Sequence, residues 1–318
     1  MWEEDDVTIY AESLLESFLR SLGGGSHSLP VILPMVENLL SINHWQNQRG
    51  ALSILKLCLN ATPLTFSQHI PVAVETAVNL SCHPCVRVQF QAIELLGALC
   101  HADGIQGDSF LTSHSIEVRK KYGGRILQML TQLLSSSCTK ISSHACLAIV
   151  SYCRGGNGKD DAGISIDSSL LLPFMSDVLM ALASGPLAFD MANEGPNHGT
   201  VTVLVRAIAA VACLAEAVGE EFAPFYGNIM PGLMSCAQYG LDIKKVGGLT
   251  GALAQDLVTL RGAAVEAATI VGQAVGDIGG YLGYVSLSSI LLIAFSFLIG
   301  TLSHISSTFF LFRRTVLS

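Results

Sequence analysis

The chain has 318 residues, enough for two ordinary domains or one extended array of repeats. Half of the residues are hydrophobic and only 13% are charged, against about 25% in typical globular domains, so a large share of the chain must be buried. The formal net charge of −8 argues against nucleic acid as the main partner and favours basic proteins.

The cysteines and the N-terminus indicate a reducing compartment. Nine cysteines lie between Cys58 and Cys236, many inside apolar runs, as reduced cysteines do when they act as small hydrophobic residues. The acidic start, MWEEDDVT, lacks the features of a signal peptide. We therefore expect a cytosolic or nuclear protein, in which the glycosylation sequons at Asn60 and Asn79 stay unused.

Apolar residues recur three and four positions apart along almost the whole chain, which predicts helices. The first predicted helix covers residues 7–22 and stops at the glycine run 23–25, within a partial opening repeat of residues 1–28. Alternating β-branched runs joined by hairpin turns do not occur in the sequence. The predicted fold class is all-α.

Residues 29–279 repeat one pattern about five times. A first helix carries proline near its start, a short polar turn follows, and an arginine opens the second helix in most units. One helix pair cannot bury its apolar face, but stacked pairs can, so the pattern predicts a right-handed α-solenoid. Insertions are expected near residues 154–165, 184–200 and 239–256. The arginines expected to open second helices are Arg49, Arg87, Arg206 and Arg261.

The stretch NLSCHPCVRVQF, residues 79–90, contains a Cys-x-x-Cys spacing at Cys82 and Cys85. A redox motif would need a βαβ setting, and the flanking segments are helical. A zinc site would need four ligands, and Cys100-His101 lies at the far end of the next helix, about 20 Å away. The stretch is best interpreted as the turn between the two helices of a repeat.

No motif in the sequence indicates catalysis. The segment GGNGKDD, residues 155–161, lacks the first glycine and the Ser/Thr that a phosphate-binding loop requires. Nucleophile elbows, His-Glu-x-x-His and paired-acid motifs do not occur either. We therefore predict no catalytic residue, no cofactor site and no metal site, and a protein that is not an enzyme.

The turn-plus-arginine pattern resembles the HEAT repeat, which favours an acidic residue six positions before the arginine; Asn43 and Ser81 hold that place here. Three stretches make the resemblance more specific than the HEAT repeat alone: HPCVRVQFQAIELLGALC, VGEEFAPFYGNIMPGLM and LVTLRGAAVEAATIVGQAVG. They resemble the central repeats of karyopherins of the importin-β3 group (importin-5 type), and the resemblance covers roughly residues 7–280.

The resemblance implies a fragment of a nuclear transport receptor of cytoplasm and nucleus. Such receptors bind basic cargo, such as ribosomal or histone-like proteins, on a concave face formed by the second helices. Glu94, Glu216 and Glu266 lie in those helices and are the candidate cargo-facing residues. The family also implies Ran-GTP and nucleoporins as partners. Its members are about three times as long, and their N-terminal Ran-binding repeats are expected to be missing here.

The apolar C-terminal tail, residues 280–318, has two interpretations. Val285–Leu302 is eighteen residues without a charge, long enough for a membrane span with Arg313 and Arg314 beside it. The tail could instead be an artefact of gene prediction, because the karyopherin-like pattern breaks near Gly280. A genuine span would favour the alternative function, a HEAT-repeat scaffold anchored in a membrane by its C-terminus.

Overall fold

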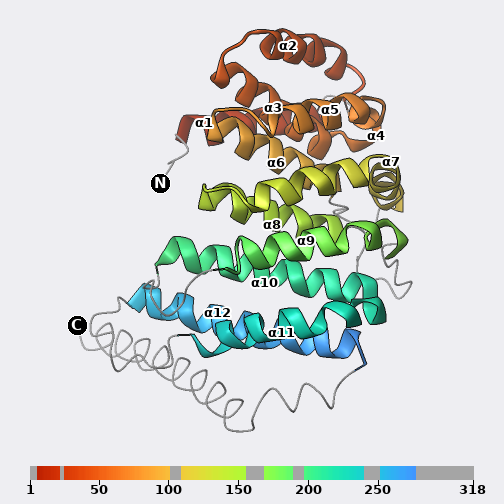
Figure 1. The fold of residues 1–318 in the computed structure, drawn as a ribbon. Helices are drawn as coiled ribbons and strands as arrows, with labels where there is room; N and C mark the ends of the chain where they lie inside the picture. The colour runs from red at the N-terminus through yellow and green to blue at the C-terminus, as the bar shows by residue number, and fades with distance from the viewer. Residues whose placement is uncertain are drawn as a thin grey trace, which may run out of the picture. The chain divides into compact units, whose positions relative to one another are not determined.

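The computed structural model describes residues 6–21, 25–100, 109–154, 168–188, 197–239 and 251–276 (Figure 1). Every regular element in these ranges is a helix, and they contain no strand. The chain divides into two compact units, Met1–Ala181 (unit 1) and Leu182–Ser318 (unit 2). The predicted all-α class is therefore observed throughout the described ranges.

The described residues of unit 1 form longer helices, a four-residue helix and two 3₁₀ turns. The last helix, α9, ends just beyond the boundary of the unit. The elements are α1 (Asp6–Ser21), α2 (Leu29–Ser41), α3 (Trp45–Ala61), α4 (Pro63–Phe66), η1 (Ser67–His69), α5 (Ile70–Leu80), α6 (Val86–Cys100), α7 (Ser109–Leu134), α8 (Thr139–Arg154), η2 (Ser168–Leu170) and α9 (Leu172–Ser184).

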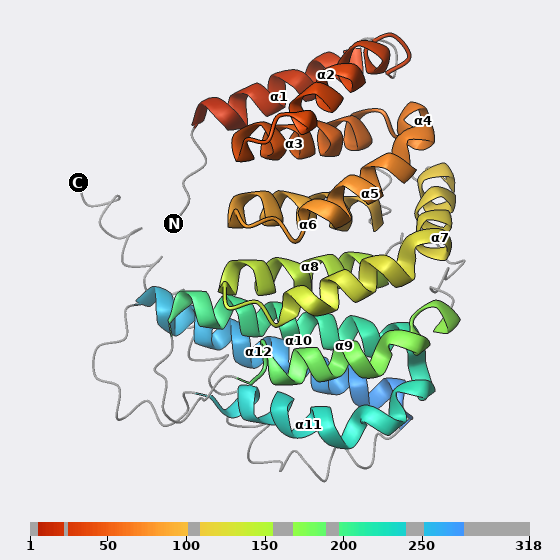
Figure 2. The ribbon, with the colours of Figure 1, turned by 45° about the horizontal axis from the view of Figure 1, so that its top comes forward.

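The helices of unit 1 form two layers (Figure 2). In the inner layer α1 packs on α3, α3 on α6, and α6 on α8. The outer layer contains α2, α5 and α7, which pack on the inner helices α3, α6 and α8, respectively. Each outer helix and its inner partner form one repeat, and successive repeats bury a continuous core.

The turn between α5 and α6 shows how local sequence sets these pairs. Pro71 lies in the first turn of α5, where a missing backbone N–H costs nothing. Ser81 ends the helix: its buried hydroxyl donates to the carbonyl of Val78 at 2.7 Å. The backbone N–H of Cys85 then donates to His83 Nδ1 at 2.9 Å, just before α6 begins. The predicted inter-helix turn therefore lies where the sequence indicated.

Two consecutive glycines in the middle of α7 admit aromatic side chains from its neighbours. A Cβ atom built on Gly123 would overlap the hydroxyl of Tyr152, a fully buried residue of α8. A Cβ atom on Gly124 would lie 2.8 Å from the ring of Phe174 in α9. Only glycine lets these helices pack so closely, which offsets its low helix propensity.

Unit 2 contains α10 (His198–Val218), η3 (Gly219–Phe222), α11 (Ala223–Gln238) and α12 (Gly251–Ala274). Asn197 caps α10 by accepting from the N–H of Thr200 at 2.9 Å. Gly219, with φ +61°, ends the helix in a conformation that favours glycine. Both α10 and α11 pack on α12. The buried residues of α10 and α12 include many alanines: Ala207, Ala210, Ala212, Ala215, Ala264, Ala267 and Ala268.

Two helices begin earlier than the sequence pattern suggested. Arg206 was expected to open a helix, but α10 begins at His198, and α12 begins at Gly251, well before Arg261. The segments VTVLV and ALAQDL continue the helical spacing and contain no breaker, so both helices extend upstream.

Several predicted features lie outside the described residues. They include most of the expected insertions, at residues 155–167, 189–196 and 240–250, and the whole tail 280–318 with the candidate span. Among the helices that are described, the stretch His198–Gln238 is long and apolar enough to cross a membrane. Most of its apolar window is buried within the protein, as expected of a core helix.

Candidate functional site on the inner helices

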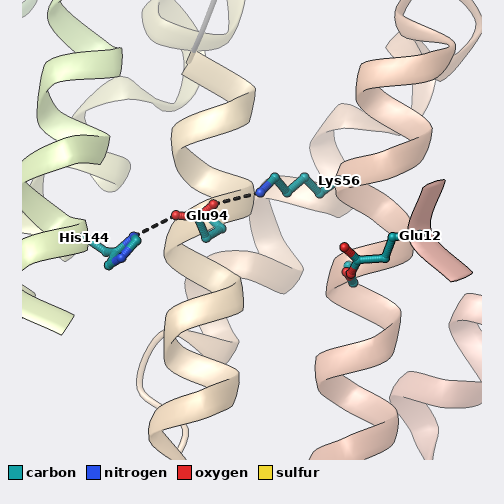
Figure 3. A network of polar contacts seen from close by, with 5 residues as sticks. Glu12, Lys56, Glu94 and His144 are labelled. Carbon is teal, nitrogen blue, oxygen red and sulfur yellow. Dashed lines mark hydrogen bonds and ion pairs between the residues drawn. The ribbon is translucent and has the colours of Figure 1, made fainter. Parts of the chain in front are cut away.

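A polar ladder joins three consecutive inner helices of unit 1 (Figure 3). Lys56 Nζ in α3 donates to Glu94 Oε2 in α6 at 2.7 Å. On the other side of α6, His144 Nδ1 in α8 lies 2.8 Å from Glu94 Oε1. One carboxylate therefore ties together helices whose residues are 38 and 50 positions away along the chain.

The surroundings of Glu94 keep its carboxylate ionised. Burial raises its pKa, but the hydrogen bonds from His144 and Lys56, with the charge of Lys56, lower it to about 2 from the ordinary 4.5. The three side chains are between 19% and 31% exposed, so water screens their attraction only in part. Glu94 is thus a well-satisfied anion that holds helices in register.

Contacts beside the ladder fix the same helices. The ring of Phe90 meets the ring of His144 edge-on at 4.3 Å, and Arg87 lies over the ring of Trp45 at 5.4 Å. Along the same layer, Ser53 of α3 donates to Glu12 of α1. These polar and aromatic contacts connect each inner helix of unit 1 to the next.

The structure separates the three predicted cargo-facing acids into two environments. Glu94 in unit 1 is half-buried and bonded on both sides. Glu216 in α10 and Glu266 in α12 are exposed, and in the part of unit 2 that the structure describes neither forms an ion pair or side-chain hydrogen bond. Only these two acids are available to a ligand as they stand.

The four arginines expected to open second helices fall into two groups by their position in the helix. Arg87 is the second residue of α6, and Arg49 is the fifth residue of α3. Arg206 and Arg261 lie in the interior of α10 and α12. Arg261 is buried, and its Nε donates to the carbonyl of Leu257 at 3.2 Å, within its own helix.

The Cys82–Cys85 pair has no bond between its sulfurs. Both cysteines are free thiols, and Cys82 Sγ lies 3.7 Å from Met129 Sδ in α7. Within the described ranges, no group of three or more His, Cys, Asp or Glu side chains is placed to hold a metal ion. Cys82 and Met129 also line a cavity of about 380 Å³ between α5 and α7. Its lining residues are Val78, Asn79, Cys82, Arg125, Gln128, Met129 and Gln132.

A buried cation, Arg119, lies close to Cys100, the last residue of α6. Arg119 of α7 is 2% exposed and lies close enough to Cys100, Tyr152 and Cys153 to interact with them electrostatically. Burial lowers the pKa of Arg119, raises that of Cys100 to about 12, and also raises that of Tyr152. These groups are shielded from solvent, so we assign the cluster to packing.

The sequence did not reveal Lys56 and His144 as partners of Glu94. A weak signal was present, because Lys56 and Glu94 are lone charges inside the apolar runs LSILKLCL and AIELLGA. Such charges in an inner helix usually need a partner. Which partner it would be depends on the register of three helices, which sequence spacing alone does not define.

The two layers of helix pairs define a class, the α-solenoid of HEAT-like repeats. No protein-family model matches the sequence. Importin subunit beta-3 of Saccharomyces cerevisiae is 25% identical over 276 residues, which are 86% of this chain and 21% of that protein. This homology confirms the karyopherin resemblance predicted from the sequence. The chain spans about a fifth of the length of that curated relative.

Solved structures agree on the fold. The structure of Kap121p bound to Pho4p has a TM-score of 0.66 and 21% identity, covering 91% of this chain and 24% of that one. Kap121p bound to Nup53p gives a TM-score of 0.65 at 21% identity, with the same coverage of both chains. At this identity the likeness establishes the fold alone, and it confirms the predicted solenoid of HEAT-like helix pairs.

Proposed function

We propose that this chain forms part of a nuclear transport receptor of the karyopherin type and binds protein cargo without catalysing a reaction. The homology to importin subunit beta-3 over 276 residues carries this proposal. The fold supports it, because a stack of helix pairs offers an extended binding surface. The protein would then act in both cytoplasm and nucleus.

The proposed cargo is a basic segment of a ribosomal-protein or histone-like kind, bound in unit 2. The described helices of that unit carry five acids, Glu216, Glu220, Glu221, Asp256 and Glu266, and two arginines. Asp256 bonds to His198, and Arg261 is buried. Among the exposed acids, Glu216 and Glu266 lie in α10 and α12, which contain the segments predicted as second helices, and they are the proposed contacts for Lys and Arg side chains of the cargo.

Glu94 has a different role in this proposal. Its two hydrogen bonds leave little capacity for a cationic ligand, and displacing Lys56 would leave an ammonium group partly buried without its partner. We therefore assign Glu94 to positioning the inner helices of unit 1. Nucleoporins and Ran-GTP complete the proposed set of partners; the known complex of Kap121p with Nup53p supports the former.

Fluorescence anisotropy with a labelled Lys/Arg-rich peptide tests the cargo proposal. The full chain should bind at low salt and lose at least about tenfold in affinity as salt rises through the physiological range, because exposed charges are screened. Glu216→Lys/Glu266→Lys should remove binding. Glu37→Lys/Asp177→Lys, the same charge change at exposed acids of α2 and α9 in unit 1, is the control. Equal loss in both variants, or salt-independent binding, would argue against the proposed site.

A further inference from the structure

The inner helices α3, α6 and α8 of unit 1 are rich in cations, although the chain as a whole is acidic. Together they carry five Lys or Arg residues and one acid, Glu94. Glu94 is bonded to Lys56 and His144, so its charge is already used within the ladder. In unit 2, by contrast, α10 and α12 carry three acids and two arginines. The inner helices of unit 1 therefore have a charge of opposite sign to that of the whole chain.

Two of these cations lie at the same level of neighbouring helices. Arg87 lies over the ring of Trp45 near the starts of α6 and α3, and Glu94 contacts Lys56 further along both helices, so the two helices run parallel. Arg87 precedes Glu94 by seven residues, or two helical turns, and Arg49 precedes Lys56 by the same number. Residues seven apart share one face of a helix. The two arginines are therefore neighbours across the contact between α3 and α6.

The third inner helix, α8, continues this arrangement. The ring of Phe90 in α6 meets that of His144 in α8, and a Cβ atom on Gly97 further along α6 would lie 3.6 Å from Ala148 further along α8. These two contacts show that α8 is parallel to α6. Lys140 precedes His144 by one turn on the same face, so it lies level with the start of α6.

Arg49, Arg87 and Lys140 consequently form a row across the first two turns of three parallel helices, which we call the basic row. Arg87 and Lys140 are exposed, and Arg49 is partly exposed. The first two turns of these helices, and the short turns that precede them in the sequence, contain no Asp or Glu. Like charges placed side by side repel, and an anionic ligand would relieve that repulsion.

We propose that the basic row binds an extended acidic segment of a partner protein, with Asp or Glu at every third position. The axes of packed helices lie about 8–10 Å apart, which defines the spacing of the row. A segment in the polyproline II conformation has three residues per turn and rises about 3.1 Å per residue. Its acids at positions i, i+3 and i+6 therefore face one side, about 9 Å apart, and match the three cations.

The net charge of the chain favours a peptide over a nucleic acid. With a formal charge of −8, the protein repels a polyanion everywhere outside the row, whereas a short acidic segment needs to contact the row alone. The site is also separate from the acids proposed to bind cargo, because those lie in unit 2. Glu216→Gln/Glu266→Gln should therefore remove binding of the basic peptide and leave the acidic segment bound.

Fluorescence anisotropy of the full chain with two labelled peptides tests the proposal. One peptide carries glutamates at i, i+3 and i+6 in a Pro/Ser-rich background, and the other carries glutamines there. At low salt the glutamate peptide should bind at least about tenfold more tightly. Arg49→Gln/Lys140→Gln should weaken its binding at least about fivefold. The matched control Lys120→Gln/Lys121→Gln, which removes two exposed charges from the outer helix α7, should change it less than about twofold.

The variant of the basic row keeps Arg87 over Trp45, so circular dichroism should show an unchanged helical fold. Lys140→Gln alone, at an exposed residue, should still weaken binding of the glutamate peptide about twofold. Equal binding of the two peptides, or equal weakening in the control variant, would overturn the proposal. A single-stranded oligonucleotide that binds more tightly than the glutamate peptide, and that Arg49→Gln/Lys140→Gln also weakens, would assign the row to nucleic acid instead.

Discussion

In unit 1 the inner helices α3, α6 and α8 are joined by the ladder Lys56–Glu94–His144, whereas in unit 2 α10 and α12 pack against each other and bury many alanines. In the ladder, the carboxylate of Glu94 binds Lys56 and His144 of the same unit. In unit 2 Glu216 and Glu266 are exposed, and neither forms an ion pair with the described residues. The same helical architecture can thus use an inner acid to position helices in one region and leave it available to a ligand in another.

The two units should respond in opposite ways to the same substitution of a helical glycine. Gly123→Ala in unit 1 would push a methyl group into the hydroxyl of buried Tyr152, and we expect a loss of about 3 kcal/mol in the free energy of unfolding. A Cβ atom at Gly227 in α11 of unit 2 would have no described atom within 4 Å, so for Gly227→Ala helix propensity should raise stability by about 0.5–1 kcal/mol. Urea denaturation followed by circular dichroism measures both.

A double mutant isolates the cause of that loss. The Tyr152 hydroxyl is buried and has no hydrogen-bond partner among the described residues, so Tyr152→Phe alone should cost little. Gly123→Ala/Tyr152→Phe should recover more than half of the stability that Gly123→Ala loses, because the overlapping oxygen is gone. A double mutant as unstable as Gly123→Ala would show that the hydroxyl contact is not the cause.

Removing the central charge of the ladder should have the next largest effect. Glu94→Gln deprives the partly buried Lys56 of its counter-ion and alters the bond to His144, so we expect a loss of about 2 kcal/mol in unfolding free energy. Glu75→Gln is the control, because its ion pair with Arg125 is about half exposed and should contribute less than about 1 kcal/mol. Equal losses of unfolding free energy in the two variants would show that the ladder stabilises the protein no more than an exposed ion pair does.

The ladder also predicts a pH dependence. The pKa of Glu94 is lowered in the folded protein to about 2 from the ordinary 4.5, so folding favours its ionised form. The resulting stability is fully present above about pH 5 and is lost as the pH falls towards 2. The difference in unfolding free energy between wild type and Glu94→Gln should therefore shrink over this window. A difference that stays constant from pH 7 to pH 3 would contradict the lowered pKa.

The smallest effect should come from the exposed pair of unit 2. His198 and Asp256 connect α10 to α12, but their side chains are 60% and 36% exposed. Asp256→Asn should change the unfolding free energy by less than about 1 kcal/mol, since water screens such pairs. Denaturation at pH 7 checks this, and a loss as large as that of Glu94→Gln would show that unit 2 also depends on an ionic tie.

Sequence periodicity predicted the helices and the turn at Ser81–Cys85, because proline, polar turn residues and apolar spacing act locally. It misplaced the starts of α10 and α12, where an arginine was taken as a helix opening although the upstream residues continue the same spacing. The candidate site was predicted less well. Glu94 was identified as an inner-helix acid, but its bonds to Lys56 and His144 depend on register across repeats.

The same limit explains why Gly123 carried no signal. In the sequence the Gly123-Gly124 pair only weakens a helix, and its reason appears when Tyr152 and Phe174 pack against it from α8 and α9. Contacts between residues this far apart along the chain are determined by how the repeats stack. Composition and spacing indicate which residues are inside, but not which of them meet.

The central claim is that the inner acids of the two units have different roles, and one binding measurement tests it most directly. The affinity of a Lys/Arg-rich peptide is compared for wild type, Glu94→Gln and Glu216→Gln/Glu266→Gln by calorimetric titration at low salt. We predict that Glu94→Gln binds within about twofold of wild type, while the unit 2 variant loses at least about tenfold. A loss on Glu94→Gln as large as that of the unit 2 variant would contradict the account.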